Sequence, residues 1–314
     1  MSGIDKVLNK LRNNVQEGNY YEAHQMYHSV SQRFIKQNKI VQATALLLDG
    51  AKQMVTFDQL GSAVDLTERL IDLFESQKLG LTSTTRGQLL EIYQNFPLKS
   101  EFCDNFVQLV INWSSKYSSH LGDPILHHLI ACRYFKEGLY YEAESHFILG
   151  GVESGTLLGL MEWDWSLQKQ HEDIGYYVTR GVLGLLNLGK SVEARACLTS
   201  FLKKVSKEIP DCIVEQVESI PLTTFELLNF SITLLEVIEK NKIEHFTPLV
   251  NQFQTQLSYD TYLEECLKNI AALYFRIGVK VVQPNPFADM LKNMLGGPQS
   301  KPSQLQIADD MDMD

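Results

Sequence analysis

One segment of this sequence has the residue pattern of a nucleotide-binding loop. The eight residues from Gly184 to Ser191 read G-x-x-x-x-G-K-S, a pattern in which backbone amides surround phosphate and the lysine contacts it. Such a loop follows a buried strand and contains small, flexible residues. Three of the four residues between the glycines are leucines, and residues 174–182 before them lack the β-branched run of a strand. We therefore interpret the segment as a turn between two helices, with nucleotide binding as an alternative function.

The histidines and cysteines are poorly placed for chemistry. His24 and His28 lie one helical turn apart, which suits a metal ion, but no carboxylate or third histidine completes a site. His127 and His128 would point to different sides of a helix. The five cysteines are scattered without a Cys-x-x-Cys pair, which predicts reduced thiols rather than disulfides or a zinc site. No catalytic arrangement of serine, histidine or cysteine is recognisable, so we predict that the protein is not an enzyme and uses no cofactor or metal.

Composition and charge narrow the class of protein. The chain has 314 residues, of which 44% are hydrophobic, enough apolar material for a core. Its 38 acidic residues exceed its 28 lysines and arginines, and the net charge of -10 argues against nucleic acid or an anionic membrane as the principal partner. The N-terminus lacks the apolar region of a secretory signal, and no apolar run reaches the ~18 residues of a membrane helix. We expect a cytosolic protein without direct membrane insertion.

A repeated heptapeptide indicates how the chain is built. Glu-Gly-Asn-Tyr-Tyr-Glu-Ala at 17–23 returns as Glu-Gly-Leu-Tyr-Tyr-Glu-Ala at 137–143, and looser copies lie at 38–43 and 189–194. Glycine or asparagine accepts the left-handed conformation that ends a helix. The glutamate suits the first turn of the next helix, and the alanine lets two helices approach closely. Repeats of this kind predict an all-α solenoid of stacked helix pairs.

Apolar residues at helical spacing predict helices along most of the chain. The first turns, near residues 18, 38 and 58, are about twenty residues apart. Pro210 and Pro221 bracket a link that we expect to be irregular or briefly helical, and no segment predicts a convincing strand. The predicted helices cover 4–15, 23–34, 40–58, 61–77, 83–95, 100–118, 124–137, 140–149, 154–169, 172–188, 191–208, 222–240, 243–256 and 259–277.

These helices are expected to form two halves followed by a tail. Residues 1–150 make the N-terminal half, residues 151–296 the C-terminal half, and residues 297–314 a disordered acidic tail. Before the tail, Phe287 and Leu291 belong to two amphipathic turns that follow a Pro-Asn-Pro break. This segment either covers the last hydrophobic face of the solenoid or binds a partner.

Charged residues in the N-terminal half suggest a binding surface. Four acids on the fourth predicted helix recur with spacings of three and four and form one stripe, with leucines on the opposite side. A small basic cluster follows the second helix. The stripe is either a solvated face or an electrostatic docking face, and opposite patches on one block favour a charged protein partner. The stripe comprises Asp65, Glu68, Asp72 and Glu75, and the basic cluster Arg33, Lys36 and Lys39.

Beyond these patterns, the sequence is similar to one known family. The most specific match is Gly-Asn-Tyr-Tyr-Glu-Ala-His-Gln-Met-Tyr at 18–27, and shorter matches keep their order and spacing over residues 5–296, at 63–66, 113–115, 121–127, 140–147, 228–230 and 259–263. On these segments the chain resembles the Golgi to ER traffic protein four family, the cytosolic adaptors of the guided-entry pathway for tail-anchored membrane proteins. The resemblance implies a right-handed α-solenoid of tetratricopeptide-like antiparallel helix pairs without catalytic activity.

The resemblance also implies partners. The N-terminal half would hold the homodimeric targeting ATPase in a nucleotide-bound state. The C-terminal half would clasp the N-terminal segment of a ubiquitin-like-domain protein, which recruits a glutamine-rich tetratricopeptide co-chaperone carrying the client. By position, the ATPase-facing residues would be Tyr20, Arg33, Lys36, Asp65 and Asp72. The residues implied for the ubiquitin-like partner are Phe230, Phe246, Tyr259, Tyr262, Phe287 and Leu291. A generic solenoid scaffold of another assembly, such as a relative of proteasome-lid or signalosome subunits, is a further alternative.

Overall fold

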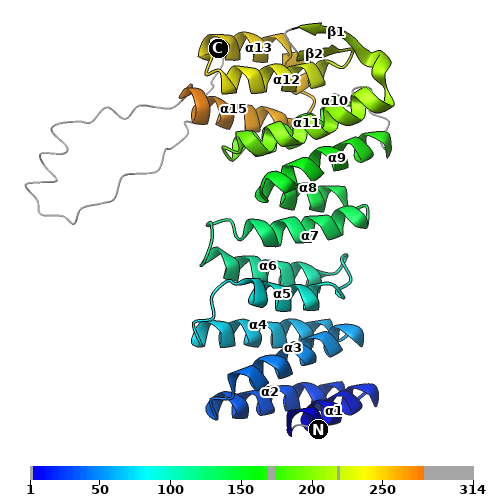
Figure 1. The fold of residues 1–314 in the computed structure, drawn as a ribbon, viewed down its shortest axis with the longest axis vertical. Coiled ribbons are helices and arrows are strands. Elements are labelled where there is room, and N and C mark those ends of the chain that lie inside the picture. The colour runs from blue at the N-terminus through cyan, green and yellow to red at the C-terminus, as the bar shows by residue number, and fades with distance from the viewer. Residues whose placement is uncertain (1–2, 169–173, 218–219, 279–314) are drawn as a thin grey trace, which may run out of the picture. The chain divides into compact units, whose positions relative to one another are not determined.

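The computed structural model describes residues 3–168, 174–217 and 220–278. These residues form fifteen α-helices, one short 3₁₀ helix and one two-stranded hairpin (Figure 1). The chain divides into two compact units, Met1–Glu137 (unit 1) and Gly138–Asp314 (unit 2), and each is described by itself. Within the described part of the chain, no helix is long and apolar enough to cross a membrane.

Unit 1 consists of seven helices connected by short turns (Figure 1). The observed helices agree with the predicted ranges to within a few residues, because the glycine and asparagine turns and the helical spacing of apolar residues define them well. They are α1 (Gly3–Gln16), α2 (Tyr20–Lys36), α3 (Ile40–Thr56), α4 (Leu60–Ser76), α5 (Ser83–Tyr93), α6 (Glu101–Ser115) and α7 (Pro124–Lys136).

The first turns of unit 1 share one geometry. Gly18, Asn38, Asp58 and Lys78 all have positive φ angles, between 54° and 84°. The next residue donates its backbone N–H to a carbonyl five residues earlier; the distance from Lys39 N to Phe34 O, for example, is 2.9 Å. This hydrogen bond closes a Schellman motif, which satisfies a carbonyl at the helix end. The turns predicted near residues 18, 38 and 58 are confirmed, and the one at Lys78 continues the series.

The repeated alanines lie at helix crossings. In five helices that follow such a turn, the fourth residue is an alanine, and its side chain is fully buried. These residues are Ala23, Ala43, Ala63, Ala143 and Ala194. A larger side chain there would separate the packed helices, so the small residue fixes their close approach.

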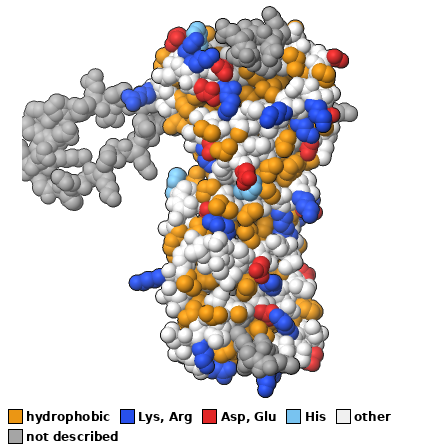
Figure 2. Space-filling model, viewed as in Figure 1, with side chains coloured by type: hydrophobic (Ala, Val, Ile, Leu, Met, Phe, Trp, Pro, Cys, Tyr) orange, Lys and Arg blue, Asp and Glu red, His pale blue; other side chains and the backbone are white. Residues whose placement is uncertain are grey.

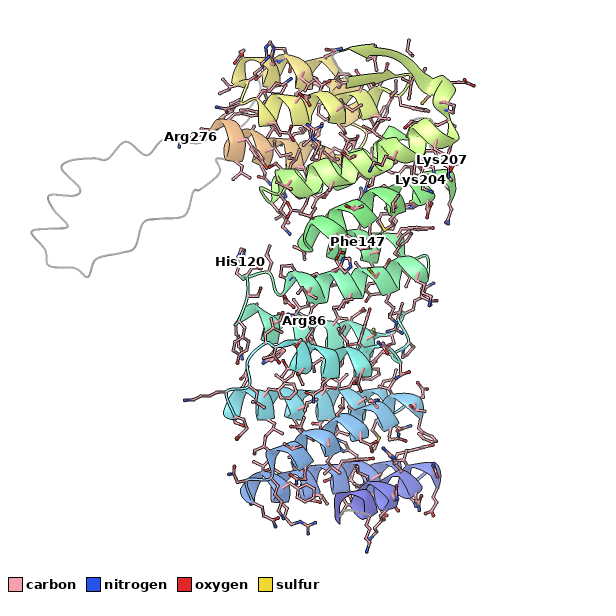
Figure 3. All side chains as sticks on the ribbon, in the orientation of Figure 1. Arg86, His120, Phe147, Lys204, Lys207 and Arg276 are labelled. Carbon is pink, nitrogen blue, oxygen red and sulfur yellow. The ribbon has the colours of Figure 1, made fainter. Side chains whose placement is uncertain are left out.

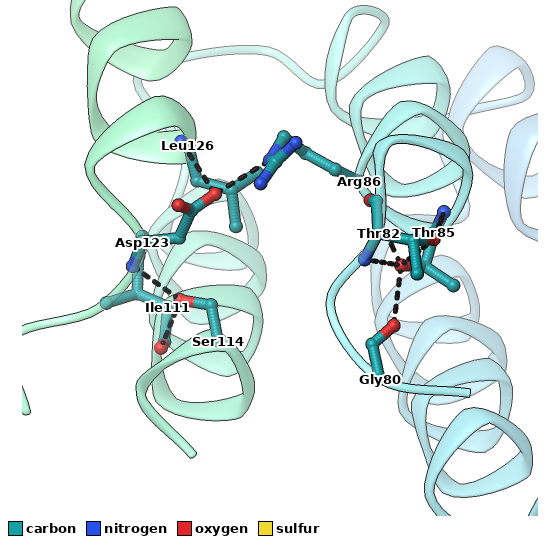
Figure 4. A network of polar contacts seen from close by, with 8 residues as sticks. All are labelled: Gly80, Thr82, Thr85, Arg86, Ile111, Ser114, Asp123 and Leu126. Carbon is teal, nitrogen blue, oxygen red and sulfur yellow. Dashed lines mark hydrogen bonds and ion pairs between the residues drawn. The ribbon is translucent and has the colours of Figure 1, made fainter. Parts of the chain in front are cut away.

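A polar network connects α5 to α7 in unit 1 (Figure 4). Asp123 is the N-cap of α7 and accepts a hydrogen bond from the backbone N–H of Leu126 at 3.3 Å. Its carboxylate also accepts one from Arg86 of α5 at 2.7 Å. The Ser114 hydroxyl of α6 accepts the Asp123 backbone N–H at 3.0 Å. The Asp-Pro pair therefore begins a helix, as its sequence predicts, and its side chain also connects two neighbouring helices.

The helices of unit 2 pack around a central helix, α10. Its α10 is buried along almost its whole length, against α8, α9, α11, α12 and α15. Phe147 of α8 is buried within unit 2, whereas Lys204 and Lys207 lie on the last turns of α11 (Figure 3). The helices are α8 (Tyr140–Leu149), α9 (Val152–Gln168), α10 (Gly175–Asn187), α11 (Ser191–Glu208), α12 (Glu226–Glu239), α13 (Ile243–Gln252), α14 (Gln254–Leu257) and α15 (Thr261–Phe275).

The link between Pro210 and Pro221 differs from its prediction in one respect. Pro210–Cys212 forms the briefly helical segment that we expected. The residues that follow pair as two antiparallel strands, β1 (Ile213–Val217) and β2 (Ile220–Thr223), with Val217 opposite Ile220. The strands were missed because each is only a few residues long. They leave the all-α class unchanged.

Candidate protein-binding surfaces

The acidic stripe on α4 is partly neutralised within unit 1. Asp65 contacts His24 of α2 and Arg69 one turn further along α4, both at 2.9 Å. Burial opposes ionisation of Asp65, but the hydrogen bonds from Arg69 and His24 outweigh it and lower the carboxyl pKa. Glu75 forms an ion pair with Lys116 of α6. Two of the four acids therefore have cationic partners inside unit 1.

Asp72 is the acid of the stripe that is best placed to meet a partner. It is exposed and lines a cavity of about 220 Å³ between α2 and α4. Among the described residues, no ion pair or hydrogen bond involves its carboxylate. The cavity is lined by Ser31, Gln32, Ile35, Leu47, Arg69, Asp72, Leu73 and Ser76. The lining combines aliphatic and neutral polar side chains with the Asp72 carboxylate and with Arg69, which already pairs with Asp65. Such a mixed lining suits a polar or aliphatic side chain of another protein.

The basic cluster lies at the C-terminal end of α2. Arg33, Lys36 and Lys39 are exposed, and no ion pair involves them within the described part of the chain. Gln32 and Ile35, which directly precede Arg33 and Lys36 in the sequence, line the same cavity as Asp72. Tyr20, by contrast, begins α2 and packs on Phe57 at 6.1 Å between ring centroids. Thirteen residues of helix place Tyr20 about 20 Å from Arg33, so Tyr20 and the basic cluster lie at opposite ends of α2.

The aromatic residues implied for the ubiquitin-like partner are unequally accessible. Phe230 and Phe246 are buried, and their rings pack on Phe253 at 5.5 Å and on Phe275 at 4.9 Å. Tyr259, just before α15, is 79% exposed. Tyr262, in the first turn of α15, is partly buried. Phe287 and Leu291 lie outside the described residues. Of the four that are described, the two tyrosines offer surface to a partner, while the phenylalanines belong to the core of unit 2.

Arg180 of α10 is the centre of a polar network that the sequence did not reveal. Its guanidinium donates to both carboxylate oxygens of Glu144 on α8, at 2.8 and 3.3 Å. It also donates to Asp260, the N-cap of α15, at 2.9 Å. The rings of Tyr141, Tyr176 and Tyr262 lie within 6.0 Å of the guanidinium carbon. One arginine therefore joins three helices of unit 2.

The segment that resembles a nucleotide loop is a helix end. Residues 184–187 belong to α10, Gly189 has a φ of 74°, and α11 begins at Ser191. Within the described part of unit 2, α8, α9 and α10 precede this segment, and no strand does. The Lys190 ammonium donates to the carbonyls of Ile148 and Gly150, at 3.0 and 2.8 Å. Burial lowers its pKa. The lysine therefore caps α8 and is not directed at a phosphate site.

The histidine pair also has no metal-site geometry. His24 contacts Asp65, as described above, and the described residues contain no group of three histidine, cysteine or acidic side chains that could hold a metal ion. On the face drawn in Figure 2, charged and apolar side chains are interspersed rather than gathered by sign.

A comparison with known proteins decides the family. The family model described as Golgi to ER traffic protein 4 matches residues 37–295. The chain belongs to this family. The Golgi to ER traffic protein 4 homologs of Xenopus tropicalis and of Homo sapiens are each 30% identical over 293 residues, which is 93% of this chain and 86% of theirs. The Aspergillus fumigatus protein is 28% identical over 96% of this chain and 92% of its own length.

The structural comparison agrees with the sequence comparison. The crystal structure of C. therm. Get4 superposes with a TM-score of 0.78 at 27% identity, covering 96% of this chain and 99% of that one. The predicted all-α solenoid fold is thereby confirmed, as is the resemblance to Golgi to ER traffic protein four.

Proposed function

We propose that this chain is a non-enzymatic adaptor in traffic to the ER, and that it works in the cytosol on tail-anchored membrane proteins. The observation that carries the proposal is the match to the Golgi to ER traffic protein 4 family over residues 37–295. The chain also offers two surfaces of different chemistry, one charged and one rich in tyrosine, in two compact units. An adaptor that joins two different proteins needs two such surfaces.

In this proposal unit 1 binds the homodimeric targeting ATPase. The contact consists of Arg33, Lys36 and Asp72 around the cavity between α2 and α4, with Tyr20 as a separate contact at the start of α2. Asp65 supports the surface from within, since it already pairs with His24 and Arg69. Exposed opposite charges on two packed helices favour a partner with the complementary arrangement, and they set specificity and association rate.

Unit 2 binds the N-terminal segment of the ubiquitin-like-domain protein through Tyr259 and Tyr262. Tyrosine at an interface combines a large apolar ring with a hydroxyl, which makes it a frequent anchor of protein contacts. Phe230 and Phe246 support this surface from the core. The ubiquitin-like protein recruits the glutamine-rich co-chaperone, so that the client passes to the ATPase for insertion into the ER membrane. Phe287 and Leu291 are proposed as additional contacts.

The first experiment is co-expression of the chain with the ubiquitin-like partner and the targeting ATPase, followed by size-exclusion chromatography with and without ATP. We expect one complex that contains all three proteins and is strengthened by ATP. A lone peak under both conditions would contradict the proposal and would favour a scaffold of another assembly.

A charge reversal tests the ATPase surface. We expect Asp72→Lys to weaken ATPase binding about tenfold, with a smaller loss at ~0.5 M salt because exposed charges are screened. Glu208→Lys, which reverses an exposed acid at the end of α11 in unit 2, is the matched control and should bind normally. Equal affinities of Asp72→Lys and the unmodified chain at low salt would remove the cavity from the interface. Asp65→Lys is less informative, since it also breaks the contacts with His24 and Arg69.

A further inference from the structure

Asp260, the N-cap of α15, makes the polar contacts at the start of that helix. Asp260 accepts the backbone N–H of Tyr262 at 2.9 Å and so caps the helix. The same carboxylate accepts the Tyr176 hydroxyl at 2.7 Å and the Arg180 guanidinium at 2.9 Å, both from α10. Among the described residues, the pair of Arg180 with Asp260 is the only ion pair that joins the start of α15 to another helix. The cap of α15 and its polar contacts with α10 therefore depend on the same carboxylate, beside the apolar packing of the two helices.

Arg180 is itself oriented by Glu144 of α8. Its side chain is only 14% exposed, and the two bonds to Glu144 set the orientation of the planar guanidinium. The Tyr262 ring lies 4.9 Å from the guanidinium carbon and the Tyr141 ring 5.7 Å from it, at distances typical of cation–π contacts. Arg180 thus contacts the first turn of α8 and the first turn of α15 at once.

The tyrosines around this arginine form an accessible surface. Tyr141 is 64% exposed and Tyr259 is 79% exposed, while the partly buried Tyr262 packs against Arg180. Two of these rings touch the guanidinium directly, and Tyr259 immediately precedes the carboxylate that binds it. Their relative positions therefore depend on a single side chain that itself has little exposed surface.

We infer that Arg180 is a positioning residue for a partner-binding surface made of Tyr141, Tyr259 and Tyr262. It fixes the start of α15 relative to α8, and the surface takes one peptide segment of the partner. The identity of that segment, the N-terminal segment of the ubiquitin-like-domain protein, rests on the proposed function. Tyr141 thereby joins the two tyrosines already proposed for this contact, and Arg180 acts on the partner only through the tyrosines.

A double-mutant cycle in the full-length chain tests this inference. The affinity for a synthetic peptide of the partner's N-terminal segment is measured by calorimetry for the unmodified chain, Arg180→Met, Tyr259→Ala and the double variant. We expect each single change to weaken binding roughly tenfold. We expect the double variant to be little weaker than the worse single variant, because residues that act through one another are not additive. A double loss equal to the product of the two single losses would overturn the inference.

Three further variants separate positioning from general stability. Arg195→Met removes an arginine that joins α11 to Glu236 and Glu239 of α12, and it should leave the affinity within about twofold. A loss as large as that of Arg180→Met would show a mere stability effect and overturn the inference. Arg180→Lys keeps the charge but not the fork of donors, so an intermediate affinity is expected. If Arg180→Met does not fold, Asp260→Asn keeps a capping oxygen while losing the ion pair, and unchanged affinity for that variant would overturn the inference.

The two proposals fail in different ways. An unmodified chain that does not bind the segment would overturn the proposed partner and the inference together. A second outcome would overturn the inference alone. In it, the unmodified chain binds the segment, Tyr259→Ala weakens binding and Arg180→Met leaves binding intact. Faster hydrogen exchange at the Tyr262 amide in Arg180→Met, with unchanged exchange in α9, is the expected structural signature.

Discussion

Glu162 of α9 is a carboxylic acid in the interior of unit 2. It is fully buried, and its carboxyl group faces that of Glu144. Burial, and next to it the charge of Glu144 on α8, raises its pKa well above the usual value, against the opposing charge of Arg180 on α10. The Cys197 thiol of α11 faces it as well, and burial raises the pKa of that thiol too. Glu162 is therefore neutral in the folded protein over a range where the unfolded chain ionises it.

The stability of unit 2 should consequently depend on pH through Glu162. A carboxyl group whose pKa is raised by folding stabilises the folded state fully at pH values below its unfolded pKa, which is about 4.3 for glutamate. This stabilisation is lost as pH rises towards the folded pKa. We expect Glu162→Gln, which needs no proton, to gain stability relative to the unmodified chain as pH rises from about 4.3 towards the folded pKa, by about 1.4 kcal/mol for each pH unit. Chemical denaturation at several pH values measures the difference. A difference that stays constant with pH, as we expect for the exposed Glu153→Gln, would contradict the assignment.

Lys190 illustrates how a motif can have a structural role. Its two hydrogen bonds to the carbonyls of Ile148 and Gly150 cap the end of α8, where partial negative charge collects. We expect Lys190→Met to lower the free energy of unfolding by about 2 kcal/mol, because bonds from a charged donor are stronger than neutral ones. Lys203→Met, an exposed lysine of α11, should change stability little. ATP should shift the melting temperature of neither the variant nor the unmodified chain, and an ATP-dependent shift abolished by Lys190→Met would revive the nucleotide site.

At the scale of elements, α9 and α11 approach each other at backbone distance. A Cβ atom added at Gly159 would lie 2.1 Å from the Cys197 carbonyl oxygen, and one at Gly155 would lie 2.5 Å from that of Glu193. The Ser200 hydroxyl donates to the Thr156 carbonyl across the same interface at 2.8 Å. Two glycines one helical turn apart therefore make this crossing possible.

Replacing such a glycine should separate the two helices. We expect Gly159→Ala to destabilise the protein by about 3 kcal/mol or more, because the backbone of α11 cannot move aside as a flexible side chain would. Gly87→Ala in α5 is the matched control: nothing lies within 4 Å of the added carbon, and helix propensity predicts a gain of about 0.5–1 kcal/mol. Thermal denaturation of both variants gives the comparison. Similar small effects at the two positions would show that the α9–α11 crossing can adjust.

Local signals in the sequence explain why most helices were predictable. The turn residues and buried alanines recur at fixed positions, and Asp123 with Pro124 marks the start of α7 as expected. The hairpin of β1 and β2 was missed because its strands are short and one of them contains a proline. Local patterns also could not show that Phe230 and Phe246 are buried, since a helix displays apolar residues on both core and binding faces.

The Arg180 network was beyond sequence reasoning for a different reason. Its arginine lies 36 residues from Glu144 and 80 residues from Asp260 along the chain. Only the packing of α8, α10 and α15 brings them together. Isolated charged residues on helices usually face solvent, so nothing in their spacing distinguishes these three. The pairing of Asp65 with His24 could likewise not be predicted from the sequence, because the two residues are 41 positions apart and lie on different helices.

At the scale of the whole molecule, the two units present their proposed surfaces without sharing a residue. We therefore expect the two binding activities to be separable. Asp72→Lys should weaken only ATPase binding, Tyr259→Ala only binding of the ubiquitin-like partner, and the double variant should show each loss unchanged, since independent sites are additive. Calorimetry of each pair of proteins measures this. A ubiquitin-like partner that binds Asp72→Lys more weakly would instead reveal coupling between the units.

The turn residues of unit 1 stand at intervals of twenty, at positions 18, 38, 58 and 78, and the three helices between them have 17 residues each. Each interval reverses the direction of the chain once. An insertion or deletion of twenty residues would therefore invert every helix that follows and turn its binding face over. A change of forty residues would restore the original direction. We expect that this part of the protein can be lengthened or shortened in evolution, or in the laboratory, only by whole helix pairs.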